Sequence, residues 1–141
     1  MLSGQKDSDK KAKIKLYLLD TSFLIDTVVE KSGFIAKLNE LRQRSIYLSA
    51  ISSAELLSGA KDHQVNAINN FLDTFIIIPV TDSLARKAGI TRGELKKKGY
   101  KKSLVDILIG QTAIENNLIL VTGNPKDFPQ LASKKLLMAY P

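Results

Sequence analysis

Short apolar runs alternate with longer stretches of helical periodicity along this chain. The apolar runs predict strands at 14–19, 46–48, 75–80, 118–121 and 135–139. Between them, the spacing of apolar residues predicts helices over 23–29, 33–44, 51–61, 65–74, 82–98 and 103–117, the last of them amphipathic. Strands that alternate with helices form right-handed βαβ units. We therefore predict an α/β fold, a three-layer α/β/α sandwich with a mostly parallel central sheet.

The first residues stand apart from this pattern. Residues 1–13 are polar, mixed in charge and without periodicity, so we expect a flexible tail outside the fold. The chain has 141 residues, of which 44% are hydrophobic and 25% charged, a balance typical of one globular domain. We assign residues 14–141 to that domain.

Composition excludes several kinds of site. The chain has no Cys and one His, so a disulfide framework, a thiolate zinc site and a His-rich metal site are all ruled out or disfavoured. Any metal must bind oxygen ligands. No apolar run approaches the roughly 18 residues that a membrane helix needs, and the N-terminus lacks the apolar stretch of a signal peptide. We expect a cytoplasmic protein with no membrane contact.

Positive charge is concentrated in residues 86–102. This segment has eight Lys and Arg residues and one acid, Glu94, so its formal charge of +7 equals that of the whole chain. A cluster of this kind attracts polyanions such as nucleic acid, but it also fits a solvated helix face, and both interpretations stay open here. Under the first, the predicted substrate contacts are Arg92, Lys96, Lys97 and Lys98.

Three separated acids are predicted to meet at one edge of the sheet. Asp20 ends the first predicted strand, Glu55 lies in the first turn of the helix after the second, and Asp106 lies in the first turn of the helix before 118–121. In a parallel α/β sheet these helix starts and strand ends collect on the same side, where such sheets bind ligands. The order of elements alone therefore brings the three carboxylates together.

Each acid also has a simpler interpretation as a helix cap. Ser52 to Glu55 and Ser103 to Asp106 both fit the capping-box pattern, and Asp20 could cap a helix that starts near Ser22. Only the convergence of all three argues for a site. Three close carboxylates repel one another unless a cation neutralises them, which favours Mg²⁺ or Mn²⁺. Such an ion can activate a water for phosphodiester hydrolysis.

Four sequence elements together resemble the PIN-domain nucleases, in particular VapC-type toxins. They are YLLDTSFLID at 17–26, LSAISSAELLSG at 48–59, DILIGQTAIENN at 106–117 and LILVTGNPKDF at 118–128. The resemblance implies a metal-dependent endoribonuclease whose metal-binding acids are Asp20, Glu55 and Asp106. It also implies that the hydroxyls of Ser22 and Thr122 lie beside them and orient water or phosphate.

The chain departs from this family pattern at Asn124, where relatives often have a fourth acid. Asn124 is expected to offer the metal a neutral amide oxygen in place of a carboxylate. The site therefore has one negative charge fewer, which should weaken the binding of a second metal more than that of a first. Asp127 is expected to cap or brace the same loop, with an indirect role toward the metal left open.

The resemblance further implies an RNA substrate, a homodimer and a small antitoxin partner. Two alternatives remain at this point. The first is an RNA-processing PIN nuclease without an antitoxin, and the second is a non-catalytic nucleic-acid-binding scaffold in which Asn124 has disabled the site.

Overall fold

Five parallel strands form a single central sheet in the computed structural model, which describes residues 15–28, 34–41, 45–134 and 136–139. The predicted tail 1–13 lies outside these residues. The strand order is β3-β2-β1-β4-β5. The strands are Tyr17–Leu19 (β1), Ile46–Ser49 (β2), Ile76–Ile78 (β3), Ile119–Thr122 (β4) and Leu137–Ala139 (β5). The predicted α/β fold is confirmed, and the sheet is wholly parallel.

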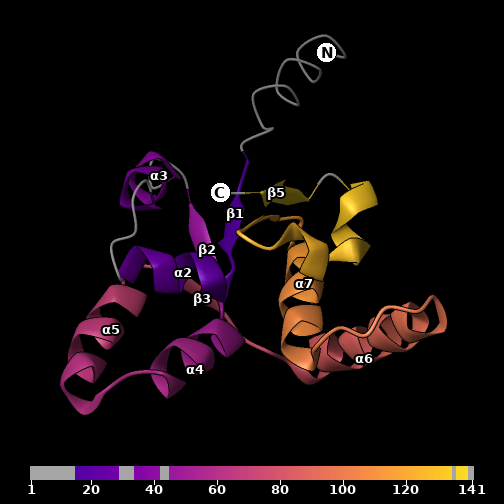
Figure 1. The fold of residues 1–141 in the computed structure, drawn as a ribbon, viewed down its shortest axis with the longest axis horizontal. Coiled ribbons are helices and arrows are strands. Elements are labelled where there is room, and N and C mark those ends of the chain that lie inside the picture. Colours follow the sequence, from indigo (N-terminus) through magenta and orange to yellow (C-terminus); the bar gives the residue numbers. More distant parts are fainter. Residues whose placement is uncertain (1–14, 29–33, 42–44, 135, 140–141) are drawn as a thin grey trace, which may run out of the picture.

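Both faces of the sheet are covered, as Figure 1 shows. Leu19 packs with one buried cluster and its neighbour Leu18 with another, because successive side chains on a strand point to opposite faces. The first face is covered by Thr21–Val28 (α2), Phe34–Leu41 (α3), Ala50–Ser58 (α4) and Val65–Leu72 (α5). The second is covered by Leu104–Asn116 (α7) and the 3₁₀ helices Pro125–Asp127 (η2) and Pro129–Lys134 (η3).

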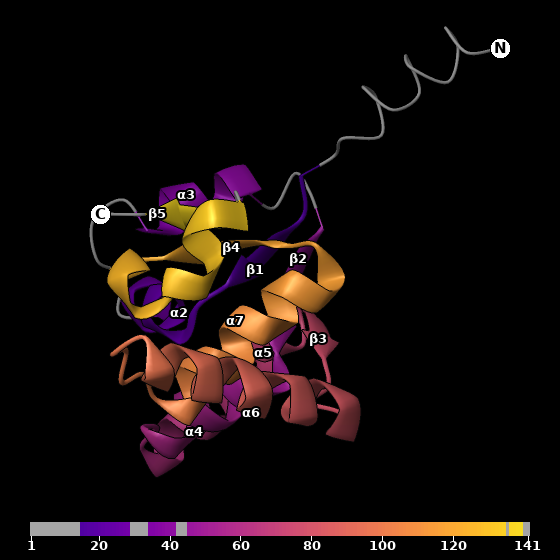
Figure 2. The same cartoon turned by 90° about the vertical axis from the view of Figure 1, so that its right-hand side faces the viewer.

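Helix α6, Asp82–Lys97, packs on the outer side of α7, as Figure 2 shows. Its Ala88 and Leu95 share a buried cluster with Ile107 and Leu108 of α7. Helix α7 is therefore buried on all sides over 107–113, and the prediction of a one-sided amphipathic helix is wrong. The sheet covers one side of α7 and α6 covers the other.

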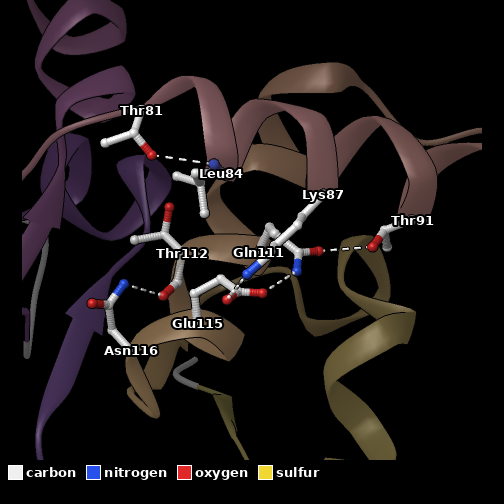
Figure 3. A network of polar contacts seen from close by, with 8 residues as sticks. All are labelled: Thr81, Leu84, Lys87, Thr91, Gln111, Thr112, Glu115 and Asn116. Carbon is white, nitrogen blue, oxygen red and sulfur yellow. Dashed lines mark hydrogen bonds and ion pairs between the residues drawn. The ribbon is translucent and has the colours of Figure 1, made fainter.

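Polar contacts join α6 to the second half of α7 (Figure 3). Lys87 Nζ lies 2.9 Å from Glu115 Oε2, and the Thr91 hydroxyl donates to Gln111 Oε1 at 2.7 Å. Hydrogen bonds from Lys87 and then Gln111 hold the pKa of Glu115 below its ordinary value. These contacts align the two helices as an antiparallel hairpin, which brings the end of α6 beside the start of α7.

The helix starts decide where two of the acids lie. Helix α4 begins at Ala50, since the Ser49 hydroxyl accepts a hydrogen bond from the Ile51 amide at 3.2 Å. Glu55 is therefore in the second turn, and both its predicted first-turn position and the capping role of Ser52 are wrong. For α7 the prediction is confirmed: Ser103 caps the helix through the Asp106 amide, and Asp106 lies in the first turn.

None of the helices in the described part of the chain combines the length and the apolar character that a membrane span requires.

Candidate functional site

Asp20 lies where the strand order reverses, between β1 and β4. It directly follows β1, and its amide donates to the carbonyl of Val121 in β4 at 3.0 Å. From β1 the chain continues to β2 on one side, whereas β4 pairs on the other. Open parallel sheets bind ligands outside the carboxyl ends of their strands at such a switch point.

The carboxylate of Asp20 is buried and accepts three hydrogen bonds. Oδ1 accepts from the Thr21 amide at 2.8 Å, and Oδ2 accepts from the hydroxyls of Ser22 at 2.9 Å and Thr122 at 2.7 Å. Hydrogen bonds to a charged acceptor are shorter and stronger than neutral ones. Ser22 and Thr122 thus orient Asp20, and their direct contact with water or phosphate stays a prediction.

Glu55 reaches this site from α4 through Thr21. The Thr21 hydroxyl donates to Glu55 Oε1 at 2.7 Å, and it lies 3.1 Å from the Ser52 hydroxyl. Thr21 is not among the site residues predicted from the sequence, although its neighbours Asp20 and Ser22 are. The signal was its place in the D-T-S segment that follows the first strand.

Asp106 is electrostatically part of the same site. Burial raises the pKa of its carboxyl above the ordinary value, and the charges of Asp127, Asp20 and Glu55 raise it further, while the hydroxyl of Ser103 acts in the opposite direction. The charges of Asp20 and Glu55 thus act on Asp106, which supports the convergence predicted from the order of elements. Asp127, at the end of η2, is the carboxylate that contributes most to this repulsion.

The donor set suits a hard divalent cation, although the acids are not preassembled around one point. Carboxylates and hydroxyls are the ligands that Mg²⁺ and Mn²⁺ prefer, and a buried acid with a raised pKa gains most from a nearby cation. Among the described residues, no group of three His, Cys, Asp or Glu side chains already stands close enough to hold one ion. Binding would have to draw Glu55 and Asp106 inward toward Asp20.

Asn124 lies at the exposed rim of this site. It precedes η2, and its backbone amide donates to the Thr122 hydroxyl at 3.0 Å. Thr122 thus links the backbone of the loop to the carboxylate of Asp20. Whether the Asn124 side chain binds metal stays a prediction.

The basic segment is divided by the fold. Arg86 pairs with Asp82, and Lys87 pairs with Glu115. A cavity of about 600 Å³ opens where α6 meets the start of α7; we call it the α6–α7 cavity, and its lining residues are Arg92, Lys96, Gly99, Lys101, Lys102 and Ser103. Two of the predicted substrate contacts, Arg92 and Lys96, thus line a cavity. The other two, Lys97 and Lys98, are exposed and do not.

Comparison with known proteins assigns this chain to a family. The PIN domain family model matches residues 17–134, so the chain belongs to the PIN domain family. Its curated relatives within that family are VapC ribonucleases. Ribonuclease VapC1 of Methanocaldococcus jannaschii is 32% identical, covering 86% of this chain and 90% of the relative. The tRNA(fMet)-specific endonuclease VapC of Shigella flexneri is 26% identical, covering 82% and 91%.

Solved structures agree with this assignment. The structure of VapBC2 from Rickettsia felis bound to a promoter DNA fragment superposes with a TM-score of 0.75 at 28% identity, covering 89% of this chain and 99% of that one. A toxin-antitoxin complex from Klebsiella pneumoniae superposes with a TM-score of 0.71 at 29% identity, covering 87% and 96%. The resemblance to PIN-domain nucleases of the VapC type is confirmed.

Proposed function

We propose that this PIN-domain ribonuclease is the toxin of a type II toxin-antitoxin pair and hydrolyses RNA phosphodiester bonds with Mg²⁺ or Mn²⁺. The proposal is supported by the placement of Asp20 at the switch point of the sheet, by the contact of Glu55 with the neighbouring Thr21, and by the charges of Asp20 and Glu55 that raise the pKa of Asp106. The names of the relatives support the reaction, and the general metal dependence of VapC nucleases supports the cofactor.

The three acids have different parts in this proposal. Asp20 is fixed by three donors, so its carboxylate presents a rigid negative charge. Glu55 is oriented by Thr21, and Asp106 is held in a partly buried position that disfavours its ionised form. When bound, the metal would neutralise these charges and supply a more acidic water for attack on phosphorus.

Asn124 completes the ligand set with a neutral oxygen at the rim. Because it adds no charge, we expect one tightly bound ion with a second bound only weakly, if at all. Asp127 is held by Lys102, whose Nζ lies 3.6 Å from its Oδ1, so this carboxylate is partly neutralised already.

A small antitoxin and a second copy of the chain are the expected protein partners. Two of the similar solved structures are described as a VapBC assembly and a toxin-antitoxin complex, which supports the antitoxin. The homodimer rests on the family resemblance. A neighbouring gene for a small antitoxin would separate a toxin from an RNA-processing PIN nuclease.

Cleavage of mixed RNAs with Mn²⁺, Mg²⁺ or chelator tests the reaction. Glu55→Gln and Asp106→Asn should each reduce metal-dependent cleavage by at least about 100-fold, since a lost ligand removes several kcal/mol of charge stabilisation. They are better probes than Asp20→Asn, which would turn an amide toward three hydrogen-bond donors.

Asp73→Asn provides the matched control, because Asp73 is an exposed acid at the end of α5. It should cleave like the wild type, and all three variants should give cooperative melting curves. Full activity of Glu55→Gln would refute the proposal. RNA binding without cleavage by the wild type would favour the scaffold alternative that Asn124 suggests.

A further inference from the structure

The α6–α7 cavity is a concave basic site that lies beside the acids. It has no role in the proposed reaction. Four of its six lining residues are cationic: Arg92, Lys96, Lys101 and Lys102. The only ion pair that these four make with a described acid is Lys102 with Asp127. The cavity therefore keeps a clear excess of positive charge, which attracts an anion.

The backbone around the cavity is well defined. Gly99 has a φ of +90°, a conformation that side-chain-bearing residues rarely adopt, and its amide donates to the Lys96 carbonyl at 3.0 Å. The Tyr100 amide donates to the Leu95 carbonyl at 2.9 Å, and Arg92 Nε donates to the Lys102 carbonyl at 3.3 Å. These hydrogen bonds hold the turn after α6 against the end of that helix. The cations of the cavity therefore lie on a defined backbone rather than along a free helix face.

Two contacts connect the cavity with the acidic site. Ser103 lines the cavity and also caps α7 through the amide of Asp106, at 3.1 Å. Lys102 lines the cavity and pairs with Asp127, the carboxylate that most strongly repels Asp106. The basic cavity and the acidic site are therefore neighbours, so an extended polyanion can contact both.

An exposed aromatic ring adds a second type of contact. Tyr100 stands in the chain between two lining residues, Gly99 and Lys101, and the residue is 44% exposed. Aromatic side chains beside cationic grooves stack on unpaired bases, and such stacking needs no particular base sequence. A base within a duplex is already stacked and cannot use the ring in this way.

We propose that the α6–α7 cavity seats a backbone phosphate of a single-stranded RNA segment next to the cleaved bond, with Tyr100 stacking on an adjacent base. This inference rests on the proposed function, since it assumes that RNA lies across the acidic site. It assigns substrate contact to Lys101, Lys102 and Tyr100, and it separates Lys96 from Lys97 and Lys98, which the sequence alone treats alike.

The test measures how tightly the full chain binds a fluorescein-labelled single-stranded RNA of about 12 nucleotides. The buffer contains chelator, so that no cleavage occurs. The variant is Lys96→Gln/Lys101→Gln, which removes two lining cations. The control is Lys97→Gln/Lys98→Gln, which removes the same charge from residues outside the cavity. The variant should bind about tenfold more weakly than the wild type, with a salt slope smaller by about 1.4, and the control should lose less than about twofold.

Equal losses of RNA affinity in the two double variants would overturn the inference. They would show that the lysines act through a diffuse positive field and not through a defined site. Tyr100→Leu should weaken single-strand binding by at least about fivefold, and Tyr100→Phe should retain it. Neither change should alter the binding of an RNA duplex of the same length. If Tyr100→Leu weakened both RNAs equally, the preference for single strands would be wrong.

These results are separable from the proposed function. If the wild type cleaves RNA with Mn²⁺ but the two lysine pairs behave alike, the cavity assignment fails and the reaction stands. If the lysine pairs differ as expected but Glu55→Gln still cleaves fully, the reaction fails and the binding site stands.

Discussion

The Thr122 hydroxyl donates to the Asp20 carboxylate at 2.7 Å, although 102 positions separate these residues in the chain. The same hydroxyl oxygen accepts the amide of Asn124 at 3.0 Å. Thr122 is itself fully buried, at 0% exposure, so water cannot replace either contact. One side chain thus joins the end of β1, the end of β4 and the loop that follows β4.

Thr122→Val should therefore destabilise the fold while keeping the shape of the side chain. The substitution leaves the Asp20 carboxylate with one donor fewer and the Asn124 amide without its acceptor. We expect the free energy of unfolding to fall by about 1–3 kcal/mol. Urea unfolding measures this loss, and RNA cleavage should fall with it because Asp20 is less well oriented. Thr122→Ser keeps the hydroxyl and should lose less than half as much. A Val variant as stable as the wild type would contradict the bracing role.

Asp106→Asn should stabilise the metal-free protein at neutral pH. The folded-state pKa of Asp106 is raised by burial and by neighbouring acids, so its ionised form is less favourable in the folded chain than in the unfolded one. By linkage, its contribution to stability is greatest below the ordinary pKa of 3.8 and is lost as the pH rises through the folded-state pKa. Asp106→Asn cannot ionise, so the variant does not lose this stability as the pH rises.

Melting temperatures in chelator, measured from pH 7.5 downward, test this sign. The gain of Asp106→Asn over the wild type should shrink as the pH approaches 3.8. A gain that grew as the pH fell would contradict the assignment of the raised pKa to Asp106.

Asn124→Asp should strengthen metal binding, because it adds a fourth carboxylate at the rim of the site. We expect Mn²⁺ to bind about tenfold more tightly, with a second ion detectable by calorimetric titration. The metal-free variant should be slightly less stable, since the new charge adds to the repulsion among the acids. Asn70→Asp, at an exposed position of α5, provides the control and should leave the titration unchanged.

Gln130 offers a prediction outside the site. Its amide nitrogen and oxygen are both buried, and no residue in the described part of the chain hydrogen-bonds to them. Gln130→Met should raise the free energy of unfolding by about 1 kcal/mol, because it removes an unsatisfied polar group while keeping the length of the side chain. A neutral or destabilising result would show that the amide has a partner such as water.

Much of the acidic site could be predicted from the sequence, because the meeting of strand ends and helix starts is a matter of topology. The order of elements places Asp20 and Asp106 correctly. Glu55 reaches the site from a different turn than predicted, since Ser49, Ser52 and Ser53 are all possible caps for α4 and only the backbone geometry selects Ser49. Neighbouring serines carry no signal that distinguishes them.

The remaining contacts depend on packing, which spacing cannot supply. The D-T-S segment places Thr21 beside Asp20, but it does not mark Thr21 as the partner of Glu55, because that contact follows from the way α2 lies against α4. Lys101 and Lys102 belong to the basic segment but are not among the substrate contacts predicted from the sequence. Their cavity exists because α6 folds back along α7, and that angle is set by buried side chains such as Leu95 and Ile107.

The pairing of β1 with β4 also affects the order in which the molecule can be completed. The ribosome makes Asp20 and Glu55 early, but β4, the second neighbour of β1, and the hydroxyl of Thr122 come near the end of the described fold. A chain still being synthesised therefore carries an unfinished centre until β4 has been made. For a nuclease made beside ribosomal and messenger RNA, the strand order postpones assembly of the candidate site until Thr122, 102 positions after Asp20, has been added.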